Sequence, residues 1–257
     1  MGSKTLAGKV GVVTGASRGL GYEVARQAAE EGATVVAAAR SFDEAELPTG
    51  APEPGRIHRL RTDVTRQQEA EGLLDACEES FGRVDFIVNN AGILGASRLH
   101  ETTDALWEAL MGVHMNATFW TCRRFIGLAM AAHRPGSIVN VGSILSFAGD
   151  GYLAAYTAMK SGVAGLTRAI AIDYGREGIR ANFVAPGDME TEMIEEYFRG
   201  TPDPAAARAE MEGYYPAKRL IGADEVARAV IFLASDLASS VNGTSIVVDG
   251  GLLANAY

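Results

Sequence analysis

The chain is poor in several features that define particular protein classes. It has only two cysteines, Cys77 and Cys122, and they form no CxxC pair. Both lie in helix-like stretches, so we expect buried or half-buried thiols rather than a disulfide framework. No apolar run approaches the roughly 18 residues that span a bilayer, and residues 1–5 lack the apolar stretch of a secretion signal. We therefore expect a cytoplasmic protein with no membrane partner.

Positive charge is also scarce. The 23 Lys and Arg residues face 32 Asp and Glu residues, for a net charge of −9. A nucleic-acid-binding protein usually carries a basic face, so this balance argues against nucleic acid as a partner. Apolar residues make up 47% of the chain and charged residues 21%, as in soluble globular proteins. The length suits one α/β domain, and we predict a single domain over residues 1–257.

Short β-rich runs alternate with helical patterns along the chain. Several of the runs are nearly continuous in apolar residues, as strands covered by helices on both faces must be. This alternation predicts an α/β fold with about seven parallel strands and helices on both faces. The expected strands are Val10–Thr14, Thr34–Ala38, Ile57–Thr62, Phe86–Asn89, Ser137–Val141, Arg180–Val184 and Thr244–Val248, and the expected helices are 19–31, 66–81, 103–132, 153–177 and 223–235.

Two segments interrupt this alternation. Ser41–Arg56 is rich in Pro and Gly, so a regular crossover helix there would be short or absent. The second segment, 188–218, is inserted before the last helix and carries short amphipathic pieces. It is either a surface helical pair or a mobile lid over a ligand cleft, and we favour the lid because long insertions at strand ends are usually functional.

A glycine-rich turn follows the first strand and opens the first helix. Such a turn brings backbone N–H groups and a helix N-terminus up to a phosphate. The spacing is GxxxGxG, not the usual dinucleotide GxGxxG. The candidate phosphate-binding residues are Gly15, Ser17, Arg18, Gly19, Leu20 and Gly21. Gly15–Gly19 also fits the GxSxG motif of serine hydrolases, but no earlier strand precedes it to supply an oxyanion hole, so we set that alternative aside.

The end of the second strand bears on which nucleotide binds. No acid stands there to bind a ribose 2′-hydroxyl; Arg40 does instead, and Arg18 lies in the glycine turn. Two guanidinium groups suit a 2′-phosphate, so we predict NADP(H), although both could be plain surface charges. Asp63 and Val64 follow the third strand and are placed to meet the adenine, but Asp63 could equally cap the next helix.

Tyr156 and Lys160 are spaced four residues apart in a helical pattern. This spacing stacks phenol and ammonium on one helix face. A nearby cation lowers a phenol pKa, so we expect Tyr156 to serve as a general acid or base near neutral pH. The chain has only four lysines against 19 arginines, so the presence of a lysine at position 160 is not explained by a general abundance of lysine. Ser143, at the end of the fifth strand, can hydrogen-bond a substrate oxygen.

Together these motifs resemble the classical short-chain dehydrogenase/reductase family over nearly the whole chain. In family order they are Thr14–Gly21, Asn89-Asn90-Ala91-Gly92, Ser143, Tyr156 with Lys160, Pro186-Gly187 with Thr191, and Val248–Gly251. The resemblance implies a single Rossmann-type, doubly wound sheet, a homotetramer, and hydride transfer between a nicotinamide and a carbonyl or alcohol carbon. It implies no metal site.

The resemblance also implies roles for individual residues. Tyr156 would exchange a proton with the substrate oxygen, Ser143 would orient that oxygen, and Lys160 would hold the nicotinamide ribose and lower the Tyr156 pKa. Asn90, Ala91 and Gly92 would line the cofactor site. Pro186, Gly187, the Met189 backbone and Thr191 would lie at the nicotinamide, where Met189 and Thr191 hold its carboxamide.

One position departs from the family pattern. The family's fourth catalytic residue is an asparagine, and an ungapped match to Trp107–Phe119 places it on His114. In the family the main-chain carbonyl of this residue holds a water linked to the lysine. A histidine keeps a carbonyl, so we expect the proton path to survive and His114 to act through its backbone rather than its imidazole.

The substrate is harder to predict. Mostly apolar residues are expected near it, which favours a medium-sized, mainly apolar ketone, aldehyde or secondary alcohol. Asp188 is an unusual residue among these apolar neighbours of the substrate. It either meets a substrate hydroxyl or amine, or caps the helix that follows. Two alternatives stay open: a 3-oxoacyl-carrier reductase, which the acidic insertion disfavours, and a non-catalytic nucleotide sensor, which the presence of Ser143, Tyr156 and Lys160 disfavours.

Overall fold

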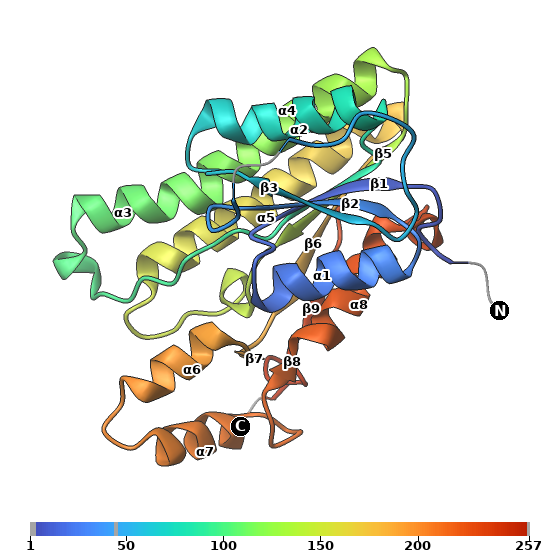
Figure 1. Cartoon of the computed structure of the whole chain (residues 1–257). Helices are drawn as coiled ribbons and strands as arrows, with labels where there is room; N and C mark the ends of the chain where they lie inside the picture. The colour runs from blue at the N-terminus through green and yellow to red at the C-terminus, as the bar shows by residue number, and fades with distance from the viewer. Residues whose placement is uncertain (1–3, 44–45, 256–257) are drawn as a thin grey trace.

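The computed structural model describes residues 4–43 and 46–255. Seven parallel strands form one central sheet in the order β3-β2-β1-β4-β5-β6-β9 (Figure 1). The predicted doubly wound, Rossmann-type α/β fold is therefore confirmed. The strands are β1 (Val10–Thr14), β2 (Thr34–Ala39), β3 (Ile57–Arg61), β4 (Phe86–Asn89), β5 (Gly136–Val141), β6 (Ile179–Pro186) and β9 (Ser245–Val248).

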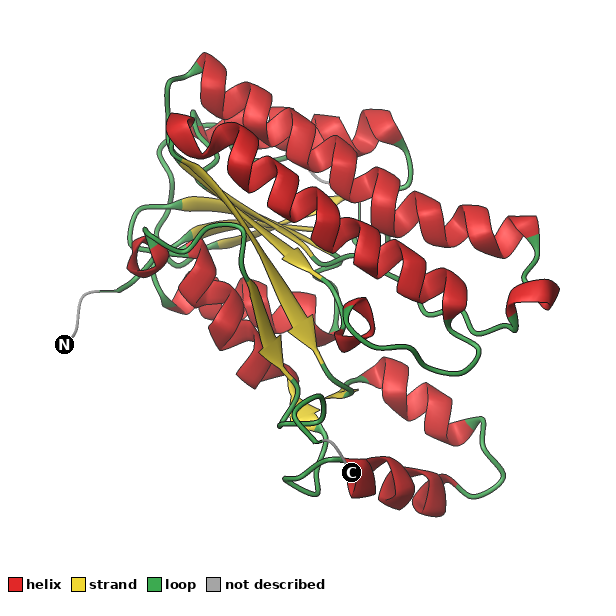
Figure 2. Cartoon of the chain, turned by 180° about the vertical axis from the view of Figure 1, so that it is seen from behind, coloured by secondary structure: helices red, strands yellow, loops and turns green. Residues whose placement is uncertain are grey.

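Helices cover both faces of this sheet (Figure 2). One face packs on α1 (Gly19–Glu30) and α8 (Ala223–Ala234). The other packs on α2 (Gln67–Phe81), α4 (Ala117–Ala131) and α5 (Ala154–Tyr174). The central strands β1, β2 and β4 are buried along their whole length, which explains their apolar runs. The edge strand β3 alternates between exposed and half-buried residues, since one of its sides has no neighbour.

Strand order reverses between β1 and β4. Val12 of β1 lies beside Val36 of β2 on one side and Ile87 of β4 on the other. In sheets of this kind, ligands bind outside the carboxyl ends of the strands at such a reversal. The glycine turn after β1 and residues 90–92 after β4 lie at this point.

The expected single helix over 103–132 is interrupted, so that prediction was wrong in its continuity. α3 (Asp104–Leu110) is followed by a π-helical segment, Met111–Asn116, before α4 begins. The wider turn holds His114 inside the protein, where its side chain is 2% exposed. π-Helical turns are rare in proteins as a whole, but those that occur are often found at functional sites. No sequence periodicity marks this one, because Met111–Asn116 reads as ordinary helix.

Segment 188–218 forms a helical pair at the carboxyl end of the sheet. It contains β7 (Met189–Glu190), α6 (Glu192–Arg199) and α7 (Pro204–Tyr214), and β7 pairs in parallel with β8 (Ile221–Gly222). Figure 1 shows the two helices side by side, extending away from the main body. In the described part of Ser41–Arg56 there is no crossover helix, as expected.

Both cysteines are free and buried, as predicted. Cys77 packs in the α2 face of the core, and Cys122 lies beside the buried amides of Asn89 and Asn140. Burial raises the pKa of both thiols, that of Cys122 to about 12, so neither environment favours a reactive thiolate. No helix in the described ranges is both long and apolar enough to cross a membrane.

Candidate active site

The glycine turn after β1 is fastened to the end of β4. The Thr14 hydroxyl accepts the N–H groups of Asn90 and Ala91 at 3.0 and 3.1 Å. The Asn90 amide donates in turn to the carbonyls of Thr14 and Gly15 at 3.0 and 3.2 Å. A Cβ on Gly15, which has φ +66°, would lie 2.8 Å from Ala91 Cα. Gly15 therefore permits the close approach that joins the two loops.

The first turn of α1 is open to an anion. Arg18 occupies the N-cap without a side-chain hydrogen bond to the helix. The first N–H groups of a helix have no intrahelical acceptor, so those of Gly19, Leu20 and Gly21 are free for a ligand. Gly21 is also required for packing, since a Cβ there would lie 2.3 Å from the Gly15 carbonyl oxygen. These features fit the diphosphate of a dinucleotide.

Arg40 and Asp63 lie together at the carboxyl ends of β2 and β3. The Asp63 carboxylate accepts the backbone N–H and hydroxyl of Thr65 at 3.0 and 2.7 Å. Burial pushes the Asp63 pKa upward, but these bonds and the charges of Arg40 and Arg66 outweigh burial and leave it lowered. Asp63 does not cap α2, whose N-cap is Arg66, so that alternative is excluded. Arg40 is exposed, and Val64 is buried against Val113 and Ala117.

Arg18 has a partner that the sequence did not suggest. Its guanidinium forms an ion pair with Glu192 at 2.8 Å and lies 3.8 Å from Glu196, both on α6. The glycine turn is therefore linked to the inserted helical pair. No local pattern signals this contact, because Arg18 and Glu192 are 174 positions apart in the chain.

Ser143, Tyr156 and Lys160 meet beyond the carboxyl end of β5. The Ser143 hydroxyl accepts the Leu145 N–H at 3.1 Å and acts on the Tyr156 phenol, where it lowers the phenol pKa. The ammonium Nζ of Lys160 lies 5.6 Å from the centre of the Tyr156 ring and donates to the Val141 carbonyl at 3.0 Å. The structure thus brings together the three side chains that the sequence singled out.

The acid–base properties of this group differ from the expectation. Burial raises the pKa of Tyr156 to about 12; the Ser143 hydroxyl opposes the rise and the charge of Asp188 adds to it. Burial also lowers the pKa of Lys160 to about 8. The predicted lowering of the Tyr156 pKa was therefore wrong, because burial raises the phenol pKa and the Lys160 charge is not among the causes of its shift.

His114 lies against the same tyrosine. Its Nε2 is 2.9 Å from the Ile93 carbonyl oxygen, and its ring is perpendicular to that of Tyr156. Burial lowers the His114 pKa to about 3, the Lys160 charge contributes, and the bond to Ile93 opposes both. A Cβ on Gly92 would lie 2.7 Å from His114 Cε1. Gly92, predicted to line the cofactor site, therefore also makes room for this imidazole.

The remaining predicted contacts lie along one chain segment after β6. Pro186 is buried, Gly187 and Met189 are half-buried, and Thr191 is the N-cap of α6 without a side-chain cap bond. Thr191 also lies next to the glycine turn, with its Cγ2 3.5 Å from where a Gly19 Cβ would be. Asp188 does not cap α6; its carboxylate accepts a hydrogen bond from Tyr215 instead. Sequence reasoning did not pair Tyr215 with Asp188, because nothing in the local pattern of Tyr215 separates it from Tyr214.

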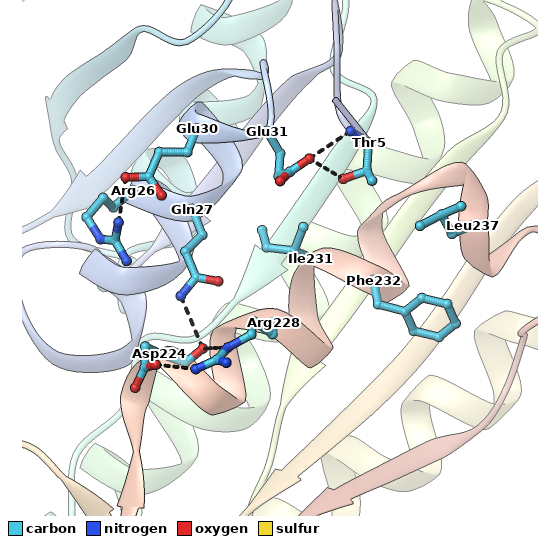
Figure 3. A pocket seen from close by; sticks show the side chains of 10 residues that line it. All are labelled: Thr5, Arg26, Gln27, Glu30, Glu31, Asp224, Arg228, Ile231, Phe232 and Leu237. Atoms are coloured by element: carbon cyan, nitrogen blue, oxygen red, sulfur yellow. Dashed lines mark hydrogen bonds and ion pairs between the residues drawn. The ribbon is translucent and has the colours of Figure 1, made fainter. Parts of the chain in front are cut away.

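A groove of about 420 Å³ lies elsewhere, between α1 and α8 (Figure 3). Its polar side chains bond to one another: Arg26 to Glu30, Gln27 to the Asp224 carbonyl, and Arg228 to the Asp224 carboxylate. None of the predicted site residues lines it. The groove is therefore separate from the tyrosine-centred site.

Comparison with known proteins agrees with this geometry. Residues 15–253 match the family model described as "Enoyl-(Acyl carrier protein) reductase". The chain is 40% identical to a 3beta-hydroxysteroid dehydrogenase of Eggerthella lenta over 96% of its own length and 94% of the relative's. The chain belongs to the short-chain dehydrogenase/reductase family. The relatives of this short-chain dehydrogenase/reductase are named as dehydrogenases and reductases, so it is an oxidoreductase that acts on alcohols or ketones.

Other relatives of this short-chain dehydrogenase/reductase act on different substrates. A cis-4-hydroxycyclohexanecarboxylate dehydrogenase of Sinomonas cyclohexanicum is 39% identical, with 98% and 99% of the two chains covered. A solved structure of Thermoplasma acidophilum aldohexose dehydrogenase superimposes with a TM-score of 0.89 at 30% identity, covering 99% and 98%. Another, from Agrobacterium tumefaciens, holds bound NADP; its TM-score is 0.85 and its identity 34%, covering 99% and 100%.

Proposed function

We propose that the protein is an NADP(H)-dependent oxidoreductase that interconverts a ketone or aldehyde and an alcohol, with Tyr156 as the general acid and base. The observation that supports this most directly is the meeting of Ser143, Tyr156 and Lys160. The Ser143 hydroxyl acts on the phenol, and Lys160 donates to the Val141 carbonyl with its Nζ over the same ring. A hydroxyl and a phenol at one point can both bond a single substrate oxygen.

The proposed cofactor fits the residues around the glycine turn. The free N–H groups of α1 suit the diphosphate, Arg18 and Arg40 suit a 2′-phosphate, and Asp63 with Val64 suit the adenine. Asn90, Ala91 and Gly92 would flank the middle of the cofactor, and Pro186, Gly187, Met189 and Thr191 its nicotinamide end. When bound, the nicotinamide gives or takes the hydride. The NADP-bound structural neighbour supports this choice of nucleotide.

Tyr156 is suited to donating a proton in the reductive direction. With a pKa raised to about 12, the phenol carries its proton at neutral pH and can give it to the oxygen of a carbonyl group as that oxygen becomes negative. Ser143 would hold the same oxygen by a second hydrogen bond. In the oxidative direction the phenolate must form first, so we expect oxidation to become faster as the pH rises.

The proton path behind Tyr156 would run through Lys160. Because burial lowers its pKa to about 8, Lys160 can lose and regain a proton near neutral pH. The main-chain carbonyl of His114 would hold the water that connects Lys160 to solvent. The His114 imidazole is already committed to Ile93, which supports a backbone role for this residue.

We further propose that the substrate is medium-sized and mainly apolar. Exposed apolar side chains on the loops around the site, such as Leu94, Phe147 and Tyr152, support this proposal. A 3-oxoacyl-carrier reductase is the second candidate, since the chain is 36% identical to the 3-oxoacyl-(acyl-carrier-protein) reductase of Escherichia coli. The exposed acids Glu190, Glu192 and Glu196 beside the site would repel an acidic carrier protein.

The expected homotetramer has support in the surface of the long helices. Phe119 on α4 and Ile172 on α5 are 44% and 82% exposed, and a subunit contact would bury them. The oligomeric state can be measured by light scattering on the purified protein.

A turnover assay tests the proposal. The purified protein is mixed with NADPH or NADH and a panel of neutral ketones, and nicotinamide absorbance is followed. We expect oxidation of NADPH with at least one apolar ketone, and little with an acyl-carrier substrate. Tight NADPH binding without turnover of any carbonyl compound would contradict the proposed reaction, and preference for the acyl-carrier substrate would favour the second candidate.

A further inference from the structure

Asp188 is held at the carboxyl end of β6 by a buried tyrosine. Its backbone N–H donates to the Tyr215 hydroxyl oxygen at 2.6 Å, and that hydroxyl donates to Asp188 Oδ2 at 2.8 Å. The Asp188 carbonyl accepts the N–H of Ile221 at 3.0 Å. Tyr215 is 0% exposed. The carboxylate therefore has a set position on rigid elements, as a substrate-contacting group requires.

One oxygen of this carboxylate remains available. The Tyr215 hydroxyl donates to Oδ2, whereas Oδ1 has no hydrogen-bond partner among residues 4–43 and 46–255. Oδ1 is not among the fully buried polar atoms that lack a partner, so a ligand can reach it. No arginine or lysine in those ranges forms an ion pair with Asp188. Burial raises the Asp188 pKa, the Tyr215 bond opposes this, and the negative charge of Asp150 adds to it. Oδ1 can therefore accept a hydrogen bond from a donor on a ligand.

Asp188 also lies close to the proposed proton donor. β5 and β6 pair in parallel, with Val141 beside Val184, so Asp188 after β6 lies at the same edge of the sheet as Ser143 after β5. The Asp188 charge also acts on the Tyr156 phenol. Asp150 supplies a second negative charge on the same side, and it acts on Tyr214 of α7 as well as on Asp188. The region from Tyr156 to the inserted helices is therefore acidic.

Cations do not offset this acidity. Arg98 stacks on the ring of Tyr152, with its guanidinium carbon 5.5 Å from the ring centre, and within the described ranges it forms no ion pair with Asp150 or Asp188. Lys160 donates to the Val141 carbonyl and, among the residues described, forms no ion pair with either acid. A carboxylate, sulfonate or phosphate on the substrate would meet the partly buried Asp188 charge without an ion-paired cation, which costs binding energy, whereas the exposed Asp150 is screened by solvent and adds little.

We propose that Asp188 is a specificity-determining residue: its free oxygen accepts a hydrogen bond from a neutral hydroxyl of the substrate, and its charge excludes anionic substrates. This inference rests on the proposed function and narrows the substrate class to uncharged alcohols or ketones that carry a second hydroxyl. It separates this chain from relatives whose named substrate bears a carboxylate, such as the cis-4-hydroxycyclohexanecarboxylate dehydrogenase.

Three alcohols of one ring size test the inference. They are the cis isomers of 4-(hydroxymethyl)cyclohexanol, 4-methylcyclohexanol and 4-hydroxycyclohexanecarboxylate, oxidised with NADP⁺ by the full-length protein. They present a neutral donor, no polar group and an anion at the same position. We expect kcat/KM to be highest for the hydroxymethyl compound. It should exceed kcat/KM for the carboxylate by about tenfold or more, because a hydrogen bond to a charged group typically contributes a factor of this size.

The variant Asp188→Asn removes the charge and keeps the size and an acceptor for Tyr215. We expect the preference for the hydroxymethyl compound over the carboxylate to fall about tenfold, mainly through KM. Asp150→Asn is the matched control, because it removes one exposed negative charge from the same side, and it should change the preference by less than about threefold. NADPH binding, measured by fluorescence, checks that both variants are folded.

The outcomes separate this inference from the proposed function. Turnover of the alcohols with a preference that Asp188→Asn leaves unchanged would overturn the inference alone. A parent protein that prefers the carboxylate would also overturn it, whether or not the variant folds. No turnover of any of the three alcohols, or of any ketone in the wider panel, would overturn the proposed function and the inference with it.

Discussion

The His114 imidazole stands edge-on to the Tyr156 phenol, with ring centres 5.3 Å apart and planes at 89°. Its Nε2 is bonded to the Ile93 carbonyl and its Cε1 faces the space left by Gly92. The imidazole therefore packs against the ring of the proposed proton donor and limits the orientations that the Tyr156 side chain can take. This contact exists because the π-helical segment Met111–Asn116 presents His114 to the interior.

We predict that His114→Asn keeps most of the activity. The proposed role belongs to the backbone, and the imidazole, with a pKa lowered to about 3, stays neutral throughout the working range. A pH–rate profile of parent and variant is the measurement. A limb near pH 6.5 that disappears in the variant, together with a loss of about tenfold or more, would instead make the imidazole part of the proton relay.

The same histidine should make the protein acid-sensitive. In the unfolded chain it binds a proton near pH 6.5, but in the folded protein only near pH 3. The unfolded state therefore binds more protons between these values, and stability falls as the pH drops through this range. At about pH 5 the loss should be about 2 kcal/mol relative to about pH 7.5. Urea unfolding should show this loss in the parent and not in His114→Asn, which lacks the titrating group; equal pH dependence in both would contradict the assignment.

We predict that Tyr156→Phe loses on the order of 10²-fold or more in turnover while keeping its NADPH affinity, because it removes only the hydroxyl that transfers the proton. Steady-state kinetics and cofactor titration measure the two effects. Tyr174→Phe is the control, since this tyrosine lies at the opposite end of α5 from Tyr156. Turnover of Tyr156→Phe within about threefold of the parent would show that another group moves the proton.

The double change Ala39→Asp with Arg40→Ile should shift preference from NADPH toward NADH. It replaces a cation beside Asp63 with the acid that a ribose 2′-hydroxyl requires. One strong phosphate contact contributes roughly 1.5–3 kcal/mol, so we expect a shift of about 10- to 150-fold in the ratio of kcat/KM values. Arg56→Ile, at another exposed arginine, should leave the ratio unchanged. Equal use of both nucleotides by the parent would mean that Arg40 is plain surface charge.

The Arg18–Glu192 ion pair should compete with the cofactor. An NADPH phosphate needs the guanidinium that Glu192 holds at 2.8 Å, so Glu192→Gln should tighten NADPH binding. Both side chains are more than half exposed, which limits the gain to about two- to fivefold, and it should shrink as salt is added. Glu190→Gln removes a charge from the same insertion without touching Arg18 and serves as the control. Equal tightening by both variants would indicate a general field effect rather than this ion pair.

Most elements of the sheet could be predicted from the sequence, because apolar runs and glycine turns are local signals. The strands at Val10–Thr14 and Phe86–Asn89 have the predicted bounds, and the other predicted strands differ by at most two residues at either end. The helix over 103–132 was predicted less well. A π-helical turn keeps the apolar spacing of the α-helices around it, so periodicity does not reveal it.

Side-chain roles at the site divide in the same way. The four-residue spacing of Tyr156 and Lys160 places them on one helix face whatever surrounds them. The direction of the Tyr156 pKa shift could not be read from that spacing, since it depends on how deeply the packed protein buries the phenol. Likewise, Asp63 and Asp188 both looked like possible helix caps, and each bonds to a different partner in the folded chain.

By itself, the sequence determined the strand and helix pattern, the glycine turn after β1 and the tyrosine–lysine pair, because each arises between residues close together in the chain. Only the tertiary structure decided which distant groups meet. His114 reaches Ile93 across 21 positions, Asp188 meets Tyr215 across 27, and Arg18 meets Glu192 across 174. Such partners depend on how the whole sheet and its helices pack, and burial in that packing then sets the charge state of Tyr156, Lys160 and His114.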